Sequence, residues 1–382
     1  MLSMLVTGGA GFVGSHLVDA LVESGHRVRV FDNLDPQVHG DRAGRPPEHL
    51  NPDAEFIHGD VRDLEALDRA LEGVEVVFHQ AAAVGVAQSM YAIRAYTETN
   101  TLGTANLLEL IAGRHRGRIR KMIVASSMSI YGEGRYVDPA NGSFVIPAPR
   151  TAERLDRGLW EPLVPGADRE AAPAPCDELK PLEPTSIYAI NKRDPEEMFL
   201  TVGRAYGVPA VALRYFNVYG PRQALSNPYT GVGAIFSAAY LNNKPPRVFE
   251  DGLQTRDFTH VRDIVRANLL ALERPEADFE AINVGAGRPT SVLDLARRLL
   301  ERLHPGRIDD PDLAPRVTGQ YRAGDIRHCY ADIGKARRLL GFEPSTTFDQ
   351  GLGELIEWVR GRQVADDSER AFRELAERRL VT

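Results

Sequence analysis

The chain has 382 residues, enough for one large domain and a smaller lobe, because a single hydrophobic core stops growing at roughly 250–300 residues. A net charge of −7 supplies no basic field, which argues against nucleic acid or a membrane surface as a partner. The cysteines, Cys176 and Cys329, have no Cys or His neighbours at metal-ligand spacing, so we expect neither a disulfide framework nor a metal site. No secretory signal and no apolar run of about 18 residues is visible, so we expect a cytoplasmic protein.

Apolar strands alternate with amphipathic helices through the first half of the chain. We expect strands at residues 4–6, 27–31, 54–57, 74–78, 122–125 and 208–213, and helices after residue 14 and at residues 64–71 and 102–111. Strands that alternate with helices need crossover connections. This order therefore predicts an α/β fold with a doubly wound parallel sheet of the Rossmann type.

The remainder of the chain is organised differently. Beyond residue 217 the sequence breaks into turns, short strands and helices such as 292–303 and 351–359. We therefore expect a Rossmann domain at 1–217 and, at 218–382, a smaller mixed α/β lobe that binds the substrate, with some segments returning to the first domain. Residues 133–184, rich in Pro, Gly and charge, are expected to be an insertion at the edge of the cleft. The charged tail from residue 363 is expected to be a solvated helix.

A glycine-rich turn joins the first expected strand to the first helix. Gly8, Gly11 and Gly14 stand at a spacing that permits a tight turn, close approach of the backbone to a pyrophosphate, and close helix packing. The helix N-terminus then faces the phosphates with its amides and its dipole. Asp32 ends the second strand, where a carboxylate can accept both ribose hydroxyls and repel a 2′-phosphate. The sequence therefore predicts a dinucleotide site that prefers NAD to NADP.

Two further segments are expected to complete this cofactor site. Asp60, after the third strand, would lie near the adenine, and a cap for the helix that begins near Arg62 is the alternative interpretation. Residues 80–83, a glutamine and three alanines, would let the cofactor lie flat across the sheet edge. His79 before them is expected to be a packed structural residue.

A tyrosine and a lysine form the candidate catalytic pair. Tyr188 and Lys192 are four residues apart and therefore share one face of a helix. A tyrosine ordinarily titrates at about pH 10, and a nearby ammonium favours its anion, so the pair predicts a phenolate base at neutral pH. Ser126 and Ser127 follow the fifth strand and add a hydroxyl. This spacing alone is common, but together with the glycine turn and the serines it indicates catalysis.

With these residues in place, the chain resembles the extended short-chain dehydrogenase/reductase family, which contains nucleotide-sugar epimerases and dehydratases. The resemblance covers essentially the whole chain and is carried by residues 7–14, 32–34, Asp60, Asn100, 127–132, 188–192, 214–221, 256–258 and 322–325. It implies NAD as the cofactor and a nucleotide-sugar as the substrate. The implied cofactor contacts are Gly8, Gly11, Phe12, Val13, Gly14, Asp32, Asn33, Asp60, Val61, Gln80, Ala81, Ala82, Asn100, Tyr188, Lys192 and Tyr215.

The resemblance also implies roles at the reacting centre. The Ser127 hydroxyl would bond the reacting sugar hydroxyl, Tyr188 would remove its proton, and Lys192 would hold the nicotinamide ribose and tune the tyrosine. The residues implied to bind substrate are Ser127, Ser129, Asn217, Arg256, Arg322 and Asp325. The arginines match pyrophosphate ligands, since a guanidinium fork fits two phosphate oxygens, and the aspartate matches a ligand of the substrate ribose. Surface ion pairing is the alternative interpretation of these charged residues.

Two features depart from the family's pattern. Its dehydratases and decarboxylases place carboxylates directly after the catalytic hydroxyl, but Met128 and Ser129 stand here, which argues against elimination of water or CO2. Pro195, three residues after Lys192, removes a helix donor and can kink the catalytic helix. We hypothesise that the insertion at 133–184 folds over the sugar and excludes water. A peripheral loop without substrate contact is the alternative.

The simplest chemistry for this set of groups is removal of a hydride from a sugar carbon and its return to the other face. Residues 127–134 and the insertion are most similar to enzymes of 6-deoxyhexose metabolism. We therefore expect an isomerase, a 4-epimerase that converts dTDP-L-rhamnose to dTDP-6-deoxy-L-talose. A 4-ketoreductase of a dTDP-4-keto-6-deoxysugar and a catalytically idle NAD-sensing protein are the alternatives. The helices that carry residues 107–108 and 188–198 resemble the pair that forms a homodimer interface in the family.

Overall fold

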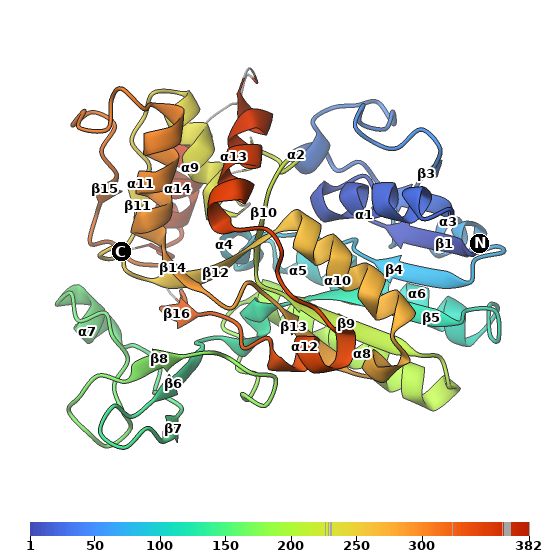
Figure 1. The fold of residues 1–382 in the computed structure, drawn as a ribbon, viewed down its shortest axis with the longest axis horizontal. Helices are drawn as coiled ribbons and strands as arrows, with labels where there is room; N and C mark the ends of the chain where they lie inside the picture. The colour runs from blue at the N-terminus through green and yellow to red at the C-terminus, as the bar shows by residue number, and fades with distance from the viewer. Residues whose placement is uncertain are drawn as a thin grey trace.

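The computed structural model describes residues 1–225, 227, 229, 231–322, 324–360, 362 and 368–381. Its largest unit is a seven-stranded parallel sheet with the order β13-β9-β5-β4-β1-β2-β3 (Figure 1). Its strands are β1 (Ser3–Thr7), β2 (Arg27–Asp32), β3 (Glu55–His58), β4 (Val76–His79), β5 (Lys121–Ser127), β9 (Ala210–Tyr215) and β13 (Ala281–Val284). The predicted doubly wound Rossmann fold is therefore confirmed.

Helices cover both faces of this sheet. One face packs against α1 (Phe12–Glu23), α10 (Val261–Glu273) and α12 (Gly334–Leu340), and the other packs against α3 (Leu64–Ala70), α6 (Gly103–Ala112) and α8 (Ile187–Tyr206). Strand β1 shows the division, because Met4 and Val6 belong to the first of these cores and Leu5 belongs to the second. A sheet buried on both faces in this way is typical of parallel α/β proteins.

The strand order reverses beside β1, and this reversal positions the site. Strands β2 and β3 follow on one side of β1, whereas β4 and β5 follow on the other. Ligands of open α/β sheets bind at the carboxyl ends of the strands where the order reverses. The cofactor is therefore expected where β1 ends at Thr7 and β4 ends at His79.

Short helical segments connect the main elements. They are α2 (Pro36–His39), α4 (Val86–Ser89), α5 (Ile93–Thr97), the π-helix η1 (Glu98–Leu102) and the 3-10 helices η2 (Met128–Tyr131) and η3 (Pro275–Ala277). Segment η1 leads directly into α6, and η2 directly follows β5. These connections therefore bring α4, η1 and η2 to the carboxyl ends of the central strands.

A smaller lobe has its own core, away from the N-terminus in Figure 1. Its strands are β10 (Asn217–Tyr219), β12 (Thr255–His260), β14 (Pro289–Ser291) and β16 (His328–Cys329), with a separate pair β11 (Arg247–Val248) and β15 (Arg316–Val317). Its helices are α9 (Val232–Leu241), α11 (Val292–Leu303) and α13 (Phe348–Val359). Tyr240, Leu299 and Leu355, one from each helix, are fully buried in this core.

One part of the second half belongs to the large sheet. Segments returning to the first domain were expected beyond residue 217 without being located, and residues 261–284 supply α10 and the strand β13, which pairs with β9. The strand was not predicted because it has only four residues and one of them is Asn283. Neither an apolar run nor a clear alternation therefore marks it.

The expected insertion, residues 133–184, forms a small unit at the lower left of Figure 1. It contains a three-stranded sheet of β6 (Arg135–Val137), β7 (Phe144–Val145) and β8 (Ala172–Ala174), and the short helix α7 (Ala152–Asp156). Its hydrophobic cluster contains Tyr136, Val164 and Ala171. The insertion is therefore a folded unit with a core of its own.

The tail differs from the expectation. Residues 363–367 lie outside the described residues, and the helix α14 (Ser368–Glu377) follows them. The helix is present, but it is solvated on one face only, because Ala371 is buried and Glu374 accepts a 2.5 Å hydrogen bond from the Tyr229 hydroxyl. Apolar and acidic side chains on one face of α14 thus pack against the lobe. Sequence periodicity alone does not reveal this contact.

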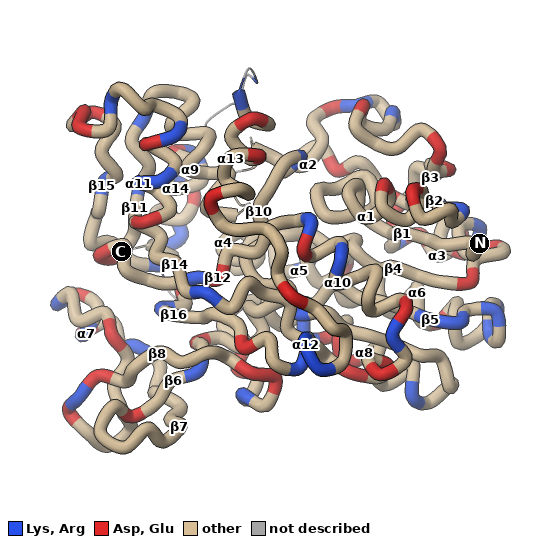
Figure 2. The backbone as a smooth tube through the Cα atoms, viewed as in Figure 1, with Lys and Arg blue, Asp and Glu red and all other residues tan. Residues whose placement is uncertain are grey.

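Charged residues of both signs are distributed over all parts of the described chain (Figure 2). The net charge of −7 is therefore spread over the molecule. Within the described ranges, no helix combines the length and the apolar character that a membrane crossing requires.

Candidate active site

The turn after β1 requires glycine at two positions. Gly8 has a φ of +68°, which L side chains rarely adopt, and a Cβ there would lie 2.6 Å from the Ala81 nitrogen. A Cβ on Gly14 would lie 2.1 Å from the Gly8 carbonyl oxygen. The backbone of the turn therefore packs against itself and against the end of β4, which forms a cradle without side chains for a pyrophosphate.

The first helix begins directly behind this turn. Its N-cap is Gly11, and Phe12 and Val13 are its first residues. A glycine cap has no side chain to satisfy the amides of the first turn, which leaves them for a bound anion. The residues predicted from the glycine spacing therefore stand where the phosphates of a dinucleotide would lie.

Asp32 ends β2 beside the turn. Its carboxylate is only 6% exposed and accepts hydrogen bonds from the backbone N–H groups of Ala10 at 3.0 Å and Leu34 at 2.9 Å. The His39 Nε2 atom lies 3.6 Å from it. A fixed, nearly buried carboxylate at this position fits ribose hydroxyls and disfavours a 2′-phosphate.

The adenine side of the site contains a second carboxylate. Asp60 accepts hydrogen bonds from Asn33 Nδ2 at 2.9 Å and from the Arg62 guanidinium. Burial raises the pKa of Asp60, but the hydrogen bonds from Arg62 and Asn33 outweigh it and lower the pKa to about 2. The cap of the following helix is Asp63, not Asp60, so the alternative interpretation of Asp60 as a helix cap is wrong. Val61, next in the chain, is buried.

The segment after β4 forms the opposite wall. Ala81 and Ala82 are partly buried there, and the side chain of Asn100 bonds both backbone groups of Ala83, at 2.7 and 3.0 Å. Asn100 is itself buried. Its amide therefore holds the wall in place, and direct contact with the cofactor stays a prediction.

His79 is a packed structural residue, as predicted. Its ring nitrogens contact the Thr7 hydroxyl at 2.7 Å and the Thr104 hydroxyl at 3.0 Å, and the ring stacks on Phe199. Burial, with a smaller effect of the Lys192 ammonium, lowers the pKa of His79 to about 3. The imidazole is therefore neutral at physiological pH.

Tyr215 ends β9 with its hydroxyl turned into a buried polar cluster. The hydroxyl contacts Asn268 Nδ2 at 2.7 Å and Gln80 Nε2 at 3.1 Å. Burial raises the pKa of Tyr215 to about 12, so this phenol is no base at neutral pH. The Tyr215 hydroxyl and the Gln80 amide are thus engaged with each other and with Asn268. Contact of Tyr215 and Gln80 with the cofactor stays a prediction.

The serine and tyrosine that are predicted to be catalytic lie near the end of β5. Ser127 caps η2, and its Oγ accepts hydrogen bonds from the Ser129 N–H at 3.2 Å and the Ser129 hydroxyl at 2.9 Å. Tyr188 lies in the first turn of α8, and its N–H donates to the Ser89 hydroxyl at 3.0 Å. The two side chains are close neighbours, since Ser127 acts on the pKa of the Tyr188 phenol. Two residues 61 positions apart thus lie near one another, and their joint catalytic role stays a prediction.

Lys192 lies one turn further along α8. Burial raises the pKa of Tyr188, and the neighbouring Ser127 side chain partly offsets this rise. The Lys192 ammonium donates to the Ala125 carbonyl at 2.9 Å, and burial lowers its own pKa to about 8. The lowering of the tyrosine pKa by the lysine therefore stays a prediction.

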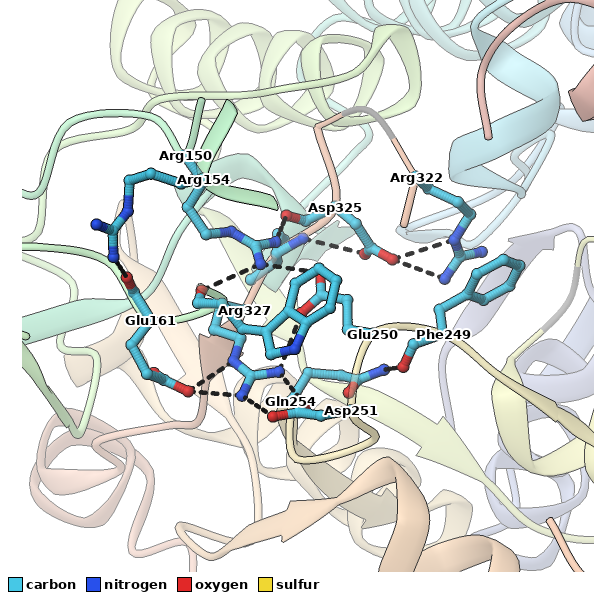
Figure 3. A network of polar contacts seen from close by, with 12 residues as sticks. Arg150, Arg154, Glu161, Phe249, Glu250, Asp251, Gln254, Arg322, Asp325 and Arg327 are labelled. Carbon is cyan, nitrogen blue, oxygen red and sulfur yellow. Dashed lines mark hydrogen bonds and ion pairs between the residues drawn. The ribbon is translucent and has the colours of Figure 1, made fainter. Parts of the chain in front are cut away.

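The residues predicted to bind the substrate nucleotide gather on the smaller lobe. Asn217 opens β10, and its buried Oδ1 has no hydrogen-bond partner among the described residues. Asp325 forms ion pairs with Arg322 at 2.8 Å and Arg256 at 3.4 Å (Figure 3 shows the former). Burial raises the pKa of Asp325, but the guanidinium groups of Arg322, Arg256 and Arg150 outweigh it and lower that pKa. Among these three residues, two cations thus face one carboxylate.

A buried ion pair behind the site was not predicted. The Arg214 guanidinium contacts the Glu196 carboxylate at 2.5 to 3.2 Å and donates to the Tyr131 hydroxyl at 2.7 Å. The Ser126 hydroxyl donates to Glu196 at 2.6 Å. The pair thus joins the neighbours of Ser127 and Tyr215 to helix α8. One signal was available in the sequence, since an arginine stands in an otherwise apolar strand, and a buried charge needs a partner.

Known proteins with this arrangement are sugar-nucleotide enzymes. Residues 4–152 and 164–285 match the NAD dependent epimerase/dehydratase family. The chain is similar to a dTDP-L-rhamnose 4-epimerase of Burkholderia thailandensis, with 34% identity over 358 residues, which cover 93% of this chain and 94% of the relative. The match therefore extends over nearly the whole of both proteins.

Solved structures agree with this assignment. A UDP-glucose 4-epimerase from Thermotoga maritima, solved with UDP-glucose, has a TM-score of 0.74 and 34% identity, and the match covers 94% of this chain and 99% of that chain. A UDP-glucuronic acid 4-epimerase from Bacillus cereus, solved with UDP-glucuronic acid and NAD, has a TM-score of 0.73 and 27% identity at the same coverage. The chain therefore belongs to the NAD dependent epimerase/dehydratase family and is an NAD-dependent sugar-nucleotide epimerase.

Proposed function

We propose that the enzyme inverts C4 of a dTDP-linked 6-deoxyhexose and interconverts dTDP-L-rhamnose and dTDP-6-deoxy-L-talose. The observation that supports the reaction type is the proximity of Ser127, at the end of β5, to Tyr188 in the first turn of α8, with Lys192 one helical turn away. The similarity to the Burkholderia thailandensis enzyme supports the sugar. Relatives that act on UDP-sugars are similar to a comparable extent, so the base and the sugar are part of the proposal.

The chemistry assigned to each side chain follows from its position. We assign proton transfer with the sugar C4 hydroxyl to Tyr188, and the neighbouring Ser127 hydroxyl would hold that group in place. A bound NAD would supply the hydride acceptor and donor for C4. Lys192 is 7% exposed and donates to a backbone carbonyl, and we assign its ammonium to the nicotinamide ribose. The reaction needs no further acid, because the proton returns from the same tyrosine.

The residues after Ser127 support epimerisation over elimination. Met128 is buried and has no ionisable group, and the Ser129 hydroxyl is engaged with Ser127 at 2.9 Å. Loss of water or CO2 requires an additional acid or base beside the sugar. These two positions supply none, so the ketone can only be reduced again.

Net reduction of a 4-keto-6-deoxysugar is the second candidate reaction of the same residues. It differs from epimerisation in one respect, because it consumes one equivalent of NADH for each product. A test of whether turnover needs added NADH therefore distinguishes the two reactions.

We also propose that the enzyme is a homodimer that pairs through α6 and α8. The two helices pack side by side, and their outer faces form a surface hollow. Its lining residues are Ala105, Leu108, Glu109, Ala112, Gly113, Met198, Val202 and Tyr206. The mostly apolar lining supports a second copy of the chain as its occupant. Light scattering should show a dimer for the wild type and a monomer for Val202→Glu.

The substrate test uses the NAD-loaded enzyme. It is incubated separately with dTDP-L-rhamnose, UDP-glucose and UDP-glucuronic acid, and products are identified by NMR of the sugar ring. The proposal predicts that dTDP-L-rhamnose is converted fastest, without added NADH. Faster conversion of a UDP-sugar would reject the proposed substrate, and a strict requirement for added NADH would identify a ketoreductase.

A further inference from the structure

The insertion, residues 133–184, is attached to a short segment of the smaller lobe, residues 321–332. The Gly134 N–H donates to the His328 carbonyl at 2.9 Å, and the Tyr321 hydroxyl donates to Asp156 at 2.9 Å. This segment also carries Arg322 and Asp325, which are predicted to bind the substrate. A lid over the sugar stays a prediction, but the contacts of the insertion point to the nucleotide end of the substrate.

Arg150 makes the most direct of these contacts. Its side chain is 6% exposed, and one guanidinium nitrogen donates to the backbone carbonyl of Asp325 at 2.8 Å (Figure 3). Another donates to the Glu250 carboxylate at 2.9 Å, and the third lies 3.7 Å from Glu133. These three contacts, one to each guanidinium nitrogen, fix the orientation of the planar Arg150 group. The group can therefore act as a rigid support for the residues that it touches.

The support matters because Asp325 arranges the anion-binding side chains. Its carboxylate pairs with Arg322 and Arg256, and Arg256 also donates to the Ile326 carbonyl at 2.6 Å. Arg150 fixes the main chain of the same aspartate. Binding groups must be held within about 0.5 Å of their productive geometry, and a support of this kind provides that precision.

A second arginine, Arg327, also connects the insertion to the lobe. Arg327 is 1% exposed and forms ion pairs with Glu161 of the insertion at 2.6 Å and with Glu250 at 3.0 Å. Glu250 has a φ of +52°, an uncommon conformation for a side chain other than glycine, and it is held between Arg150 and Arg327. Opposite charges thus alternate from the insertion into the lobe, and each buried charge has a partner.

We propose that the insertion is part of the substrate site and that Arg150 is a positioning residue that aligns Asp325, Arg256 and Arg322 for the diphosphate and ribose of the nucleotide. The inference rests on the proposed function, because it concerns the nucleotide end of the same substrate. It predicts that Arg150 determines substrate affinity and leaves the hydride chemistry at the distant end unchanged.

The test compares four forms of the full-length enzyme: the wild type, Arg150→Met, Arg150→Lys and Arg169→Met. Arg169 is the matched control, because it pairs with Asp138 inside the insertion and is 45% exposed. Glu250 keeps its ion pair with Arg327 in Arg150→Met, so no buried carboxylate is left alone. Calorimetry measures the affinity for dTDP and UDP, kinetics give KM and kcat, and bound NAD is quantified after denaturation.

We expect Arg150→Met to weaken binding of the nucleoside diphosphate and to raise KM by about tenfold, because Asp325 and the arginines that it aligns lose their support. The kcat value and the NAD content should stay close to wild type, Arg150→Lys should recover part of the affinity, and Arg169→Met should match the wild type. A fall in kcat at unchanged KM, or an equal loss in Arg169→Met, would overturn the inference. If the wild type binds neither diphosphate, the proposed function fails; if all four forms bind equally well, only this inference fails.

Discussion

Replacing Arg214 by methionine should destabilise the enzyme strongly, because it leaves a carboxylate buried without its cation. Arg214 and Glu196 have side chains that are 6% and 3% exposed. The guanidinium makes three contacts with the carboxylate between 2.5 and 3.2 Å and one with the Tyr131 hydroxyl at 2.7 Å. After the substitution, Glu196 keeps only the 2.6 Å hydrogen bond from Ser126 among these contacts.

The magnitude follows from the cost of an unpaired buried charge. Removing one partner of a buried ion pair typically lowers the free energy of unfolding by about 3–5 kcal/mol. Since total stabilities are about 5–15 kcal/mol, this loss is a large fraction of the whole. The double variant Glu196→Gln with Arg214→Met removes the stranded charge as well, so it should recover most of the loss.

Urea unfolding followed by circular dichroism measures these free energies. The matched control is Arg193→Met, which breaks an exposed pair with Glu197 on the same helix, with side chains 41% and 55% exposed. That pair should contribute at most about 1 kcal/mol. A loss below about 1 kcal/mol in Arg214→Met, or a double variant as unstable as the single one, would refute the reasoning.

Four further predictions concern the cofactor and the catalytic residues. Tyr188→Phe should lower kcat by about 10²–10⁴-fold while bound NAD is retained, as measured by turnover and cofactor release on denaturation. Gly14→Ala should abolish NAD binding in calorimetry, since its Cβ would lie 2.1 Å from the Gly8 carbonyl oxygen, and retained affinity would contradict this cradle. Asp32 should make the enzyme bind NAD more tightly than NADP, and the reverse order in calorimetry would disprove it. The pKa of Lys192 is lowered by burial from 10.5 to about 8, so the folded cofactor-free enzyme binds fewer protons than the unfolded chain between these values. Its free energy of unfolding should therefore rise by about 3 kcal/mol over this pH range relative to Lys192→Met, and parallel pH curves of the two forms would contradict the shift.

The features that depend on local spacing were predictable from the sequence. The glycines of the first turn, Asp32 at the end of β2 and the four-residue interval from Tyr188 to Lys192 are each set by one short element. A turn, a strand end and a helix face follow from neighbouring residues alone. The meeting of Ser127 with Tyr188 joins distant segments and was expected only from the resemblance to a known family.

The features that depend on packing were not predictable. The pairing of Glu196 with Arg214 requires a helix and a strand to be placed in space, and the contact of Arg150 with Asp325 joins an insertion to another lobe. Burial raises the pKa of Tyr188 and the neighbouring Ser127 partly offsets this rise, and residue spacing contains no measure of burial. Sequence patterns therefore located the reacting groups but not the charges that support them.

The most direct test of the central claim follows the hydrogen at C4. The substrate dTDP-L-rhamnose labelled with deuterium at C4 is incubated with the NAD-loaded enzyme in ordinary water, and the label in the epimerised product is measured by mass spectrometry and NMR. A hydride that leaves C4 and returns from the bound cofactor predicts that the product keeps its deuterium at C4 with inverted configuration. Replacement of the deuterium by solvent hydrogen would contradict the proposed mechanism.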